Sequence, residues 1–98
     1  MTTANLNGKV ALVAGGAKNL GGLISRDFAS DGAKVVVHYN SAGTESDANN
    51  TVQAIADMGG EAIAIQGDLT KAANVTALFE QAKDHFGGID IAVNTVGK

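Results

Sequence analysis

The sequence predicts an α/β protein, with a parallel sheet and helices packed on its faces. Four short runs rich in Val, Ile and Ala are nearly continuous in hydrophobicity, which is typical of strands buried on both faces. Three segments with helical spacing of apolar residues separate these runs, and glycines stand where the helices would end. Strand and helix therefore alternate along the chain, as in a parallel sheet with crossover helices.

The order of the strands follows from this alternation. Connections between parallel strands are right-handed, which leaves few topologies, and the dinucleotide-binding half-sheet with strand order 3-2-1-4 is favoured. We therefore expect part of a Rossmann-type doubly wound parallel sheet. The predicted strands are Val10 to Ala14, Ala33 to Tyr39, Glu61 to Gln66, and Ile89 to Asn94.

Each predicted helix has an apolar face and recognisable ends. Thr44, with Asp47 three residues later, resembles a capping box that begins the second helix. Gly32, Gly59 and Gly87 stand where C-terminal glycines belong. The predicted apolar faces are Leu20, Ile24 and Phe28 with Leu23 alongside; Ala48, Val52, Ile55 and Ala56; and Val75, Leu78, Phe79, Ala82 and Phe86.

Composition excludes several classes of site and partner. The 98 residues allow one domain, and the absence of cysteine rules out disulfides and thiolate metal sites. The net charge of -3 argues against a nucleic-acid partner. No apolar run is long enough to span a membrane, and the N-terminus lacks a signal-peptide core, so we expect a cytoplasmic protein. His38 and His85 have no neighbours at metal-ligand spacing and are interpreted as ordinary polar positions.

The sequence stops soon after the fourth predicted strand. In a doubly wound sheet this strand has another neighbour, so we expect residues 1–98 to be the N-terminal dinucleotide-binding portion of a single Rossmann-fold domain, with the C-terminal part absent. The strand from Ile89 to Val93 would then be an open apolar edge.

A glycine cluster follows the first strand in the stretch VALVAGGAKNLGG. It would lie at the N-terminus of the first helix, where unpaired backbone N–H groups and the helix dipole favour an anion. Gly15 and Gly21 would let a pyrophosphate approach the backbone. The alternative is a tight strand-to-helix turn with no ligand.

Three motifs, each just after a strand, resemble those of the short-chain dehydrogenase/reductase family. Gly15-x-x-x-Asn19-x-Gly21 resembles its Gly-x-x-x-Gly-x-Gly motif. Asp68, in GDLT, resembles the acid that contacts adenine, and NTVG, from Asn94 to Gly97, is similar to the Asn-Asn-Ala-Gly motif. The resemblance spans Lys9 to Lys98.

The sequence departs from the family pattern at three places. Asn19 replaces the middle glycine, and asparagine tolerates a left-handed backbone. Ala14 stands where the family usually has threonine, which removes a side-chain hydrogen bond. Thr95-Val96 replaces Asn-Ala and alters the packing of that loop. A cradle that no longer binds a nucleotide is therefore a further alternative.

The end of the second predicted strand bears on the choice of nucleotide. An NAD site of this architecture carries an acid there, but this chain has His38, Tyr39, Asn40 and Ser41. Asn40 and Ser41 can donate hydrogen bonds to a 2′-phosphate, and His38 is expected to face solvent. Lys18 matches the basic residue that in the family accompanies NADP preference. The combination favours NADP over NAD, and a carboxylate introduced at Tyr39 is expected to reverse it.

The resemblance also implies the remaining cofactor contacts. The backbone N–H groups of Asn19 and Leu20 would face the phosphates. Asp68 would accept a hydrogen bond from adenine, beside the backbone of Leu69; the alternative for Asp68 is an N-cap of the third helix. Asn94 and Gly97, in the last motif, would lie beside the central ribose.

No residue of the chain can be named as catalytic. The family's proton donor lies in a Tyr-x-x-x-Lys helix, but the only tyrosine is Tyr39, with no lysine four residues later. The resemblance implies an NADP(H)-dependent oxidoreductase that acts on a carbonyl or alcohol and forms a homo-oligomer, and residues 1–98 alone are expected to be inactive. The alternatives are a non-catalytic NAD(P)-binding module or redox sensor, and an α/β domain without ligand.

Overall fold

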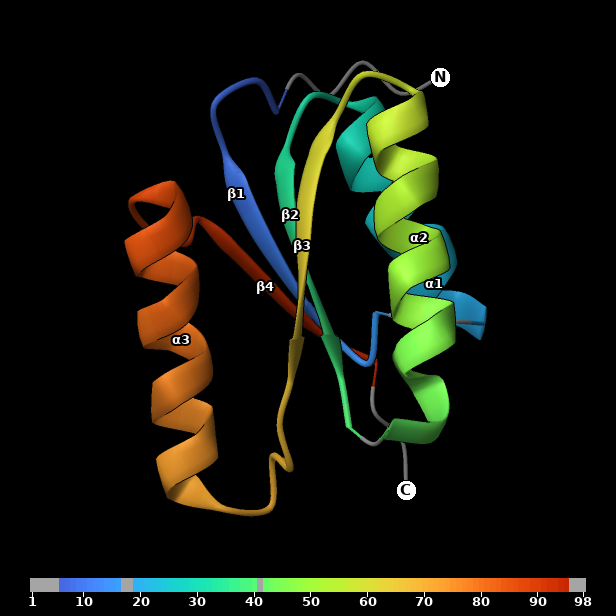
Figure 1. Ribbon diagram of the computed structural model, residues 1–98. Helices are drawn as coiled ribbons and strands as arrows, with labels where there is room; N and C mark the ends of the chain where they lie inside the picture. The colour runs from blue at the N-terminus through green and yellow to red at the C-terminus, as the bar shows by residue number, and fades with distance from the viewer. Residues whose placement is uncertain (1–5, 17–18, 41, 96–98) are drawn as a thin grey trace.

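The computed structural model describes residues 6–16, 19–40 and 42–95. Within them, a sheet lies between two helical layers (Figure 1). The elements are β1 (Val10–Ala14), α1 (Asn19–Ser30), β2 (Lys34–Tyr39), the short 3-10 helix η1 (Ala42–Thr44), α2 (Glu45–Asp57), β3 (Glu61–Gln66), α3 (Ala72–Phe86) and β4 (Ile91–Asn94).

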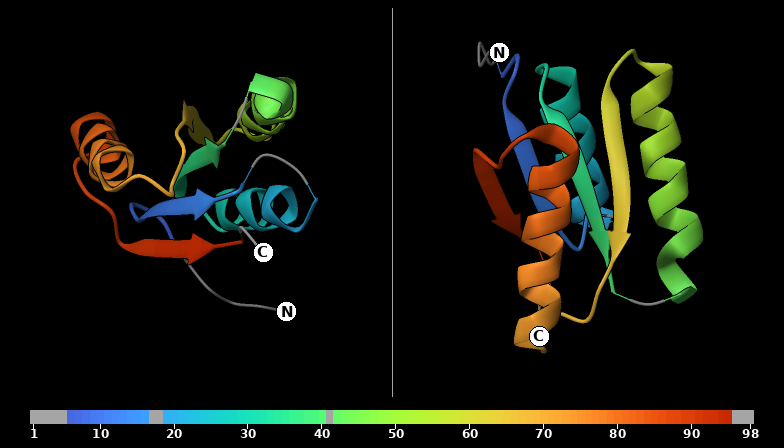
Figure 2. Two further views of the ribbon diagram at one scale, coloured as in Figure 1. Left: turned by 90° about the horizontal axis from the view of Figure 1, so that it is seen from below. Right: turned by 60° about the vertical axis from the view of Figure 1, so that its left-hand side comes forward.

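All pairings in the sheet are parallel, and the strand order is β3-β2-β1-β4, so the predicted 3-2-1-4 topology is confirmed. Helices α1 and α2 cover one face and α3 covers the other (Figures 1 and 2). This is a Rossmann-type arrangement in which β1 is flanked by β2 and β4.

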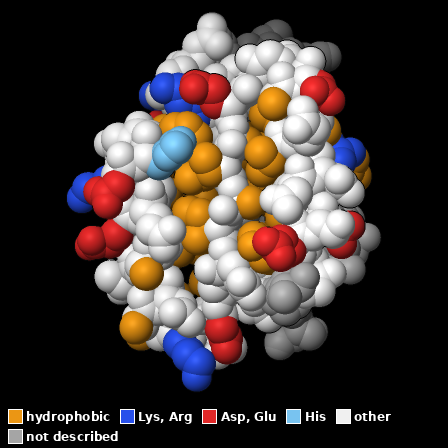
Figure 3. Space-filling model, in the orientation of Figure 1, with side chains coloured by type: hydrophobic (Ala, Val, Ile, Leu, Met, Phe, Trp, Pro, Cys, Tyr) orange, Lys and Arg blue, Asp and Glu red, His pale blue; other side chains and the backbone are white. Residues whose placement is uncertain are grey.

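The central strands separate two apolar cores. Because side chains alternate along a strand, Val35 and Val37 pack towards α1 and α2, whereas Val36 packs towards α3. Ile55 of α2 and Leu78 of α3 are the main helical contributions to the two cores. Figure 3 shows hydrophobic side chains on both sides of the front strand, β3. Each fully buried Val, Ile or Leu side chain contributes about 1.5–3 kcal/mol of transfer free energy to folding.

The predicted strand limits are correct for β1 and β3 and too long for the other two. Ala33 belongs to the turn that closes α1, where its N–H donates to Phe28 O. Asp90 precedes β4; its carboxylate accepts the Val10 N–H at 2.9 Å, and its own N–H donates to Val10 O at 2.8 Å. The outer strands β3 and β4 are only partly buried, so the prediction of strands buried on both faces holds for β1 and β2 alone.

The predicted apolar face of α1 is correct for Ile24 and Phe28, which are partly buried and pack against the core, and wrong for Leu20 and Leu23, which are 62% and 60% exposed. Gly21 and Ser25 are buried in the first two turns of the helix instead. The physical reason is that this end of the helix lies against the turn after β1, where a Cβ at Gly21 would collide with the Gly15 carbonyl oxygen.

The ends of the helices partly follow the predictions. Thr44 is the N-cap of α2, but its side chain makes no capping hydrogen bond. Gly32, Gly59 and Gly87 have positive φ angles of 103°, 89° and 91°, as expected for glycines that end helices.

The outer edge of β4 generates a prediction. No described strand pairs with that edge, and Ala92 is exposed on it. A polypeptide of residues 1–98 should therefore self-associate in sedimentation velocity over a concentration series. Ala92→Lys should reduce the association. Ala56→Lys is the matched control, because Ala56 is exposed on α2 and not part of its buried face as the sequence predicted. A monomer at every concentration would contradict the prediction.

Candidate functional site

The carboxyl ends of the four parallel strands meet at one end of the sheet, at the bottom of Figure 1. Gly15 follows β1, Asn40 follows β2, Asp68 lies just beyond β3, and Asn94 ends β4. The N-terminus of α1 opens at the same end. In open α/β sheets this is where ligands bind, at the point where the strand order reverses between β1 and β4.

The turn between β1 and α1 depends on three glycines for different reasons. Gly15 has a positive backbone φ of 75°, a conformation that residues with a side chain rarely adopt. A Cβ on Gly16 would lie 2.8 Å from both Ser25 Oγ and Val13 O. A Cβ on Gly21 would collide with the carbonyl oxygen of Gly15 and lie 2.8 Å from Thr95 Oγ1. Helix α1 and the turn are therefore in backbone-to-backbone contact at Gly21.

Asn19 is the first residue of α1, a helical position. Asn19 therefore does not need the left-handed backbone that its place in the glycine motif suggested, because it has a helical conformation. The first turn of α1 carries no acidic residue, so no carboxylate there opposes an anion at the helix N-terminus. Leu20 lies in the same turn with its side chain exposed.

Two strands hold Gly15 from opposite sides. The Gly15 N–H donates to His38 Nδ1 of β2 at 3.0 Å. On the other side, the Thr95 hydroxyl lies 2.7 Å from Ala14 O and 3.1 Å from Gly15 O, and the Thr95 N–H donates to Ala14 O at 2.9 Å. Thr95, a departure from the family motif, therefore ties the end of β4 to the turn.

Ser25 supports the turn from below. Its buried hydroxyl lies 3.1 Å from Gly16 O and 2.9 Å from Gly21 O, and its single proton can serve one of these carbonyls at a time. Ser25 is not among the site residues predicted from the sequence, although a small polar residue four positions after Gly21 is a signal for such a bond.

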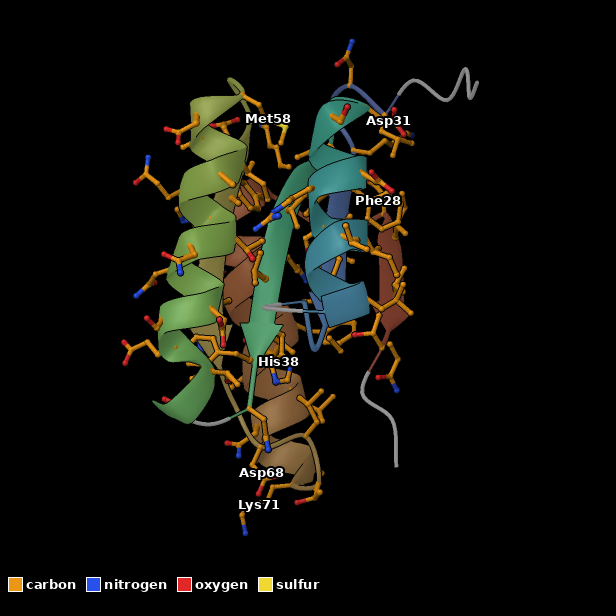
Figure 4. The ribbon with its side chains drawn as sticks, turned by 90° about the vertical axis from the view of Figure 1, so that its right-hand side faces the viewer. Phe28, Asp31, His38, Met58, Asp68 and Lys71 are labelled. Atoms are coloured by element: carbon orange, nitrogen blue, oxygen red, sulfur yellow. The ribbon has the colours of Figure 1, made fainter. Side chains whose placement is uncertain are left out.

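The expectation that His38 faces solvent is wrong. Its side chain is 1% exposed, and both ring nitrogens have backbone partners. Figure 4 shows it at the carboxyl end of β2, above the loop that carries Asp68. A buried imidazole is stable there because both of its polar atoms are satisfied. Sequence spacing gives no signal for this, since both partners come from distant parts of the chain.

Asp68 lies in a local turn and is not the N-cap of α3, which is Lys71. Asp68 Oδ1 accepts from the Thr70 hydroxyl at 2.7 Å and the Thr70 N–H at 3.0 Å. These two bonds, with a smaller contribution from the Lys71 charge, lower the pKa of the exposed Asp68 carboxyl. The group is thus held ionised, and it remains open to solvent as a hydrogen-bond acceptor.

The structure places the other predicted contacts as follows. Asn40 and Asn94 are exposed at the ends of their strands, whereas Leu69 packs against the core beneath α3 and offers only its backbone. Tyr39 is buried in the core on the opposite face, so it is unsuited to a new carboxylate. Lys18, Ser41 and Gly97 lie outside the described residues.

The described part of the chain contains neither a metal-binding cluster nor a membrane-spanning helix. Residues 6–16, 19–40 and 42–95 contain no cluster of three or more histidine or acidic side chains that could hold a metal. Across the same residues, no helix is both long and apolar enough to cross a membrane.

The contact at Gly21 gives a prediction about stability. Gly21→Ala forces the new methyl group against the Gly15 carbonyl and should lower the free energy of unfolding by roughly 1–3 kcal/mol, the usual effect of overpacking. Gly88→Ala is the control, because a Cβ at Gly88 would meet nothing within 4 Å. Urea unfolding of both variants measures the difference, and equal midpoints would show that the close contact is absent.

The Asp68 turn gives a prediction about ionisation. Thr70→Val removes the hydrogen bond from the Thr70 hydroxyl, which lowers the Asp68 pKa more than the bond from the Thr70 N–H does. The Asp68 pKa should therefore rise towards its ordinary value in Thr70→Val and stay low in Thr70→Ser. The pKa of Asp68 is lower in the folded protein than in the unfolded chain. The ionised carboxyl therefore stabilises the fold fully above the unfolded pKa, and this stabilisation is lost as the pH falls through the folded pKa. NMR titration of the carboxyl carbon measures the shift, and an unchanged pKa in Thr70→Val would contradict the assignment.

Comparison with known proteins places this geometry in a family. Residues 9–98 match the sequence profile of the short chain dehydrogenases. A hydroxynaphthalene reductase-like protein, Arp2, of Metarhizium robertsii is 46% identical over 96 residues, which cover 98% of this chain and 35% of that protein. The 3beta-hydroxysteroid dehydrogenase 1 of Eggerthella lenta is 44% identical over 93 residues, 95% of this chain and 35% of that one.

Solved structures agree with the sequence comparison. A Burkholderia cenocepacia protein described as a dehydrogenase, solved with bound NADP, superposes with a TM-score of 0.92 at 57% identity, covering 99% of this chain and 37% of that one. A short-chain dehydrogenase from Oenococcus oeni gives a TM-score of 0.90 at 39% identity, covering 99% and 44%. The chain thus spans less than half the length of each of these relatives. With this sheet order, this glycine turn and these matches, the chain belongs to the short-chain dehydrogenase family of oxidoreductases.

Proposed function

We propose that residues 1–98 are the N-terminal, cofactor-binding portion of an NADP(H)-dependent oxidoreductase. The complete protein would transfer hydride between nicotinamide and a carbonyl or alcohol substrate. The observation that carries the proposal is the turn at Gly15, Gly16 and Gly21, which leaves side-chain-free backbone beside the acid-free N-terminus of α1. A pyrophosphate fits such a place, because it needs both close approach and positive potential.

The proposed contacts follow the shape of the site. The N–H groups of Asn19 and Leu20 would face the pyrophosphate, and Gly21 would keep the helix close behind the turn. Asp68, ionised and exposed, would accept from the adenine amino group beside the Leu69 backbone. Asn94 and Gly97 would lie beside the central ribose. When bound, the cofactor supplies the hydride chemistry, and the chain supplies binding and orientation.

The preference for NADP rests on the end of β2. Asn40 is exposed at the end of β2, the region where NAD sites carry an acid, and no residue from His38 to Ser41 is acidic, so no carboxylate there would repel a 2′-phosphate. We propose that Asn40, Ser41 and Lys18 surround that phosphate. The similarity to a dehydrogenase solved with bound NADP supports this choice.

The chemistry of proton transfer would come from the rest of the protein. Tyr39, the only tyrosine of the sequence, is buried in the core and cannot serve as the donor. The family's serine and Tyr-x-x-x-Lys would follow residue 98, so residues 1–98 alone would turn over no substrate. We also propose a cytoplasmic homo-oligomer for the complete protein. A non-catalytic NAD(P)-binding module or redox sensor would share this cofactor site, and assay of the complete protein for ketone reduction distinguishes the two.

Cofactor choice gives the test of the proposal. In the complete protein, Lys18→Ala should weaken NADP binding by about tenfold or more, since a charge-assisted contact contributes about 1.5–3 kcal/mol and each 1.4 kcal/mol is a factor of ten. NAD binding should hardly change. Asn40→Asp should weaken NADP and strengthen NAD by adding a ribose partner, and it replaces the unsuitable buried position Tyr39.

Fluorescence or calorimetric titration of both cofactors against both variants provides the measurement. Equal weakening of NAD and NADP by Lys18→Ala would assign Lys18 to the shared pyrophosphate and contradict the NADP preference. Failure of the unmodified protein to bind either cofactor would overturn the proposed function itself.

A further inference from the structure

His38 connects the segment that would hold the pyrophosphate of the cofactor to the segment that would hold its adenine. Its ring lies on β2, between β1 and β3, and reaches an atom just beyond the end of each neighbouring strand. Nδ1 lies 3.0 Å from the Gly15 nitrogen, and Nε2 lies 2.7 Å from Gly67 O. Gly15 begins the glycine turn, and Gly67 immediately precedes Asp68.

The backbone of β2 reinforces the same two connections. The Gly16 N–H donates to His38 O at 3.0 Å, and the Gly67 N–H donates to Tyr39 O at 3.0 Å. The ring thus adds one bond to each of two segments that have already left the regular pairing of the sheet. Since Gly67 O accepts from the ring while Gly67 N donates to β2, the start of the Asp68 loop is held at two points.

The partners determine the protonation of the ring. The Gly15 N–H is a donor, so Nδ1 must accept, and Gly67 O is an acceptor, so Nε2 must carry the proton. Only the neutral Nε2–H tautomer satisfies both. The Gly15 N–H is also used by this bond, so it is not available to a phosphate, which leaves the N–H groups of the start of α1 for that role.

We propose that His38 is a positioning residue that fixes the glycine turn relative to the Asp68 loop, and thereby the pyrophosphate contacts relative to the adenine contacts. This proposal rests on the proposed cofactor-binding function. It assigns to His38 no contact with the cofactor: the side chain acts through Gly15 on one side and Gly67 on the other.

Two substitutions can remove the two bonds separately. In His38→Asn, the amide oxygen can occupy the place of Nδ1 and keep the bond to Gly15, but the side chain is too short for Gly67. In His38→Gln, the amide nitrogen can reach the place of Nε2 and keep the bond to Gly67, while the acceptor for Gly15 is lost. His85→Asn and His85→Gln, at an exposed position of α3, are the matched controls.

The probes are NADP and adenosine, which has the adenine and its ribose but neither the pyrophosphate nor the 2′-phosphate assigned to Lys18. In the complete protein, His38→Gln should weaken NADP by about two- to tenfold, as expected for one lost hydrogen bond, and leave adenosine near its original affinity. His38→Asn should weaken both. Equal affinities in both variants and the controls, or equal weakening of both probes by both variants, would overturn the proposal.

The ring itself gives a measurement that needs no variant. Nitrogen NMR of the unmodified complete protein should show His38 protonated at Nε2 and unprotonated at Nδ1 at neutral pH, with and without NADP. The opposite tautomer or an imidazolium would overturn the proposal, even if the variants fail to fold. Failure of the unmodified protein to bind NADP would instead count against the proposed function, while the observed tautomer would still report on the bridge.

Discussion

The site depends on how tightly the turn after β1 is enclosed. Gly15 is bound through its N–H by His38 of β2, faces the Thr95 hydroxyl with its carbonyl, and touches α1 at Gly21. No single element could provide this enclosure. It requires β1 to have a parallel neighbour on each side, and the order β3-β2-β1-β4 supplies them. The topology therefore matters for the site because it brings the ends of β2 and β4 to the same turn.

Such enclosure would favour binding of the proposed cofactor, because the backbone of the turn is fixed before a ligand arrives. The start of α1 points its N–H groups to the end of the sheet, and no acidic side chain in its first turn weakens the dipole. Asp68 is likewise prepared, since two hydrogen bonds from Thr70 hold its carboxylate ionised and oriented. Both parts of the proposed site would thus avoid some of the ordering cost of binding the cofactor.

The sequence allowed prediction of the topology, the limits of β1 and β3, and the segments that form the site. These features depend on local patterns, namely runs of β-branched residues and glycines after strands. The prediction for α1 was wrong at Leu20 and Leu23 because hydrophobic periodicity gives weight to these large apolar side chains, whereas close packing on the turn selects Gly21 and Ser25.

His38 and Thr95 escaped prediction for a related reason. Each is buried or half-buried by hydrogen bonds to segments more than twenty residues away, and no spacing in the sequence encodes such partners. From the sequence, Thr95 is expected only to alter the packing of its loop, yet its hydroxyl contacts two carbonyl oxygens of the turn. The sequence therefore indicated which segments lie at the carboxyl end of the sheet, but it did not indicate the side chains that hold those segments in place.

Hydrogen exchange at the Gly15 amide, measured by NMR in the absence of cofactor, tests the preformed turn most directly. If His38 holds this amide as described, its exchange should be slowed to the level of the neighbouring β1 amides before any ligand is added. Exchange at the rate of an unstructured chain, with protection appearing only on addition of NADP, would show that the ligand forms the turn and would contradict this account.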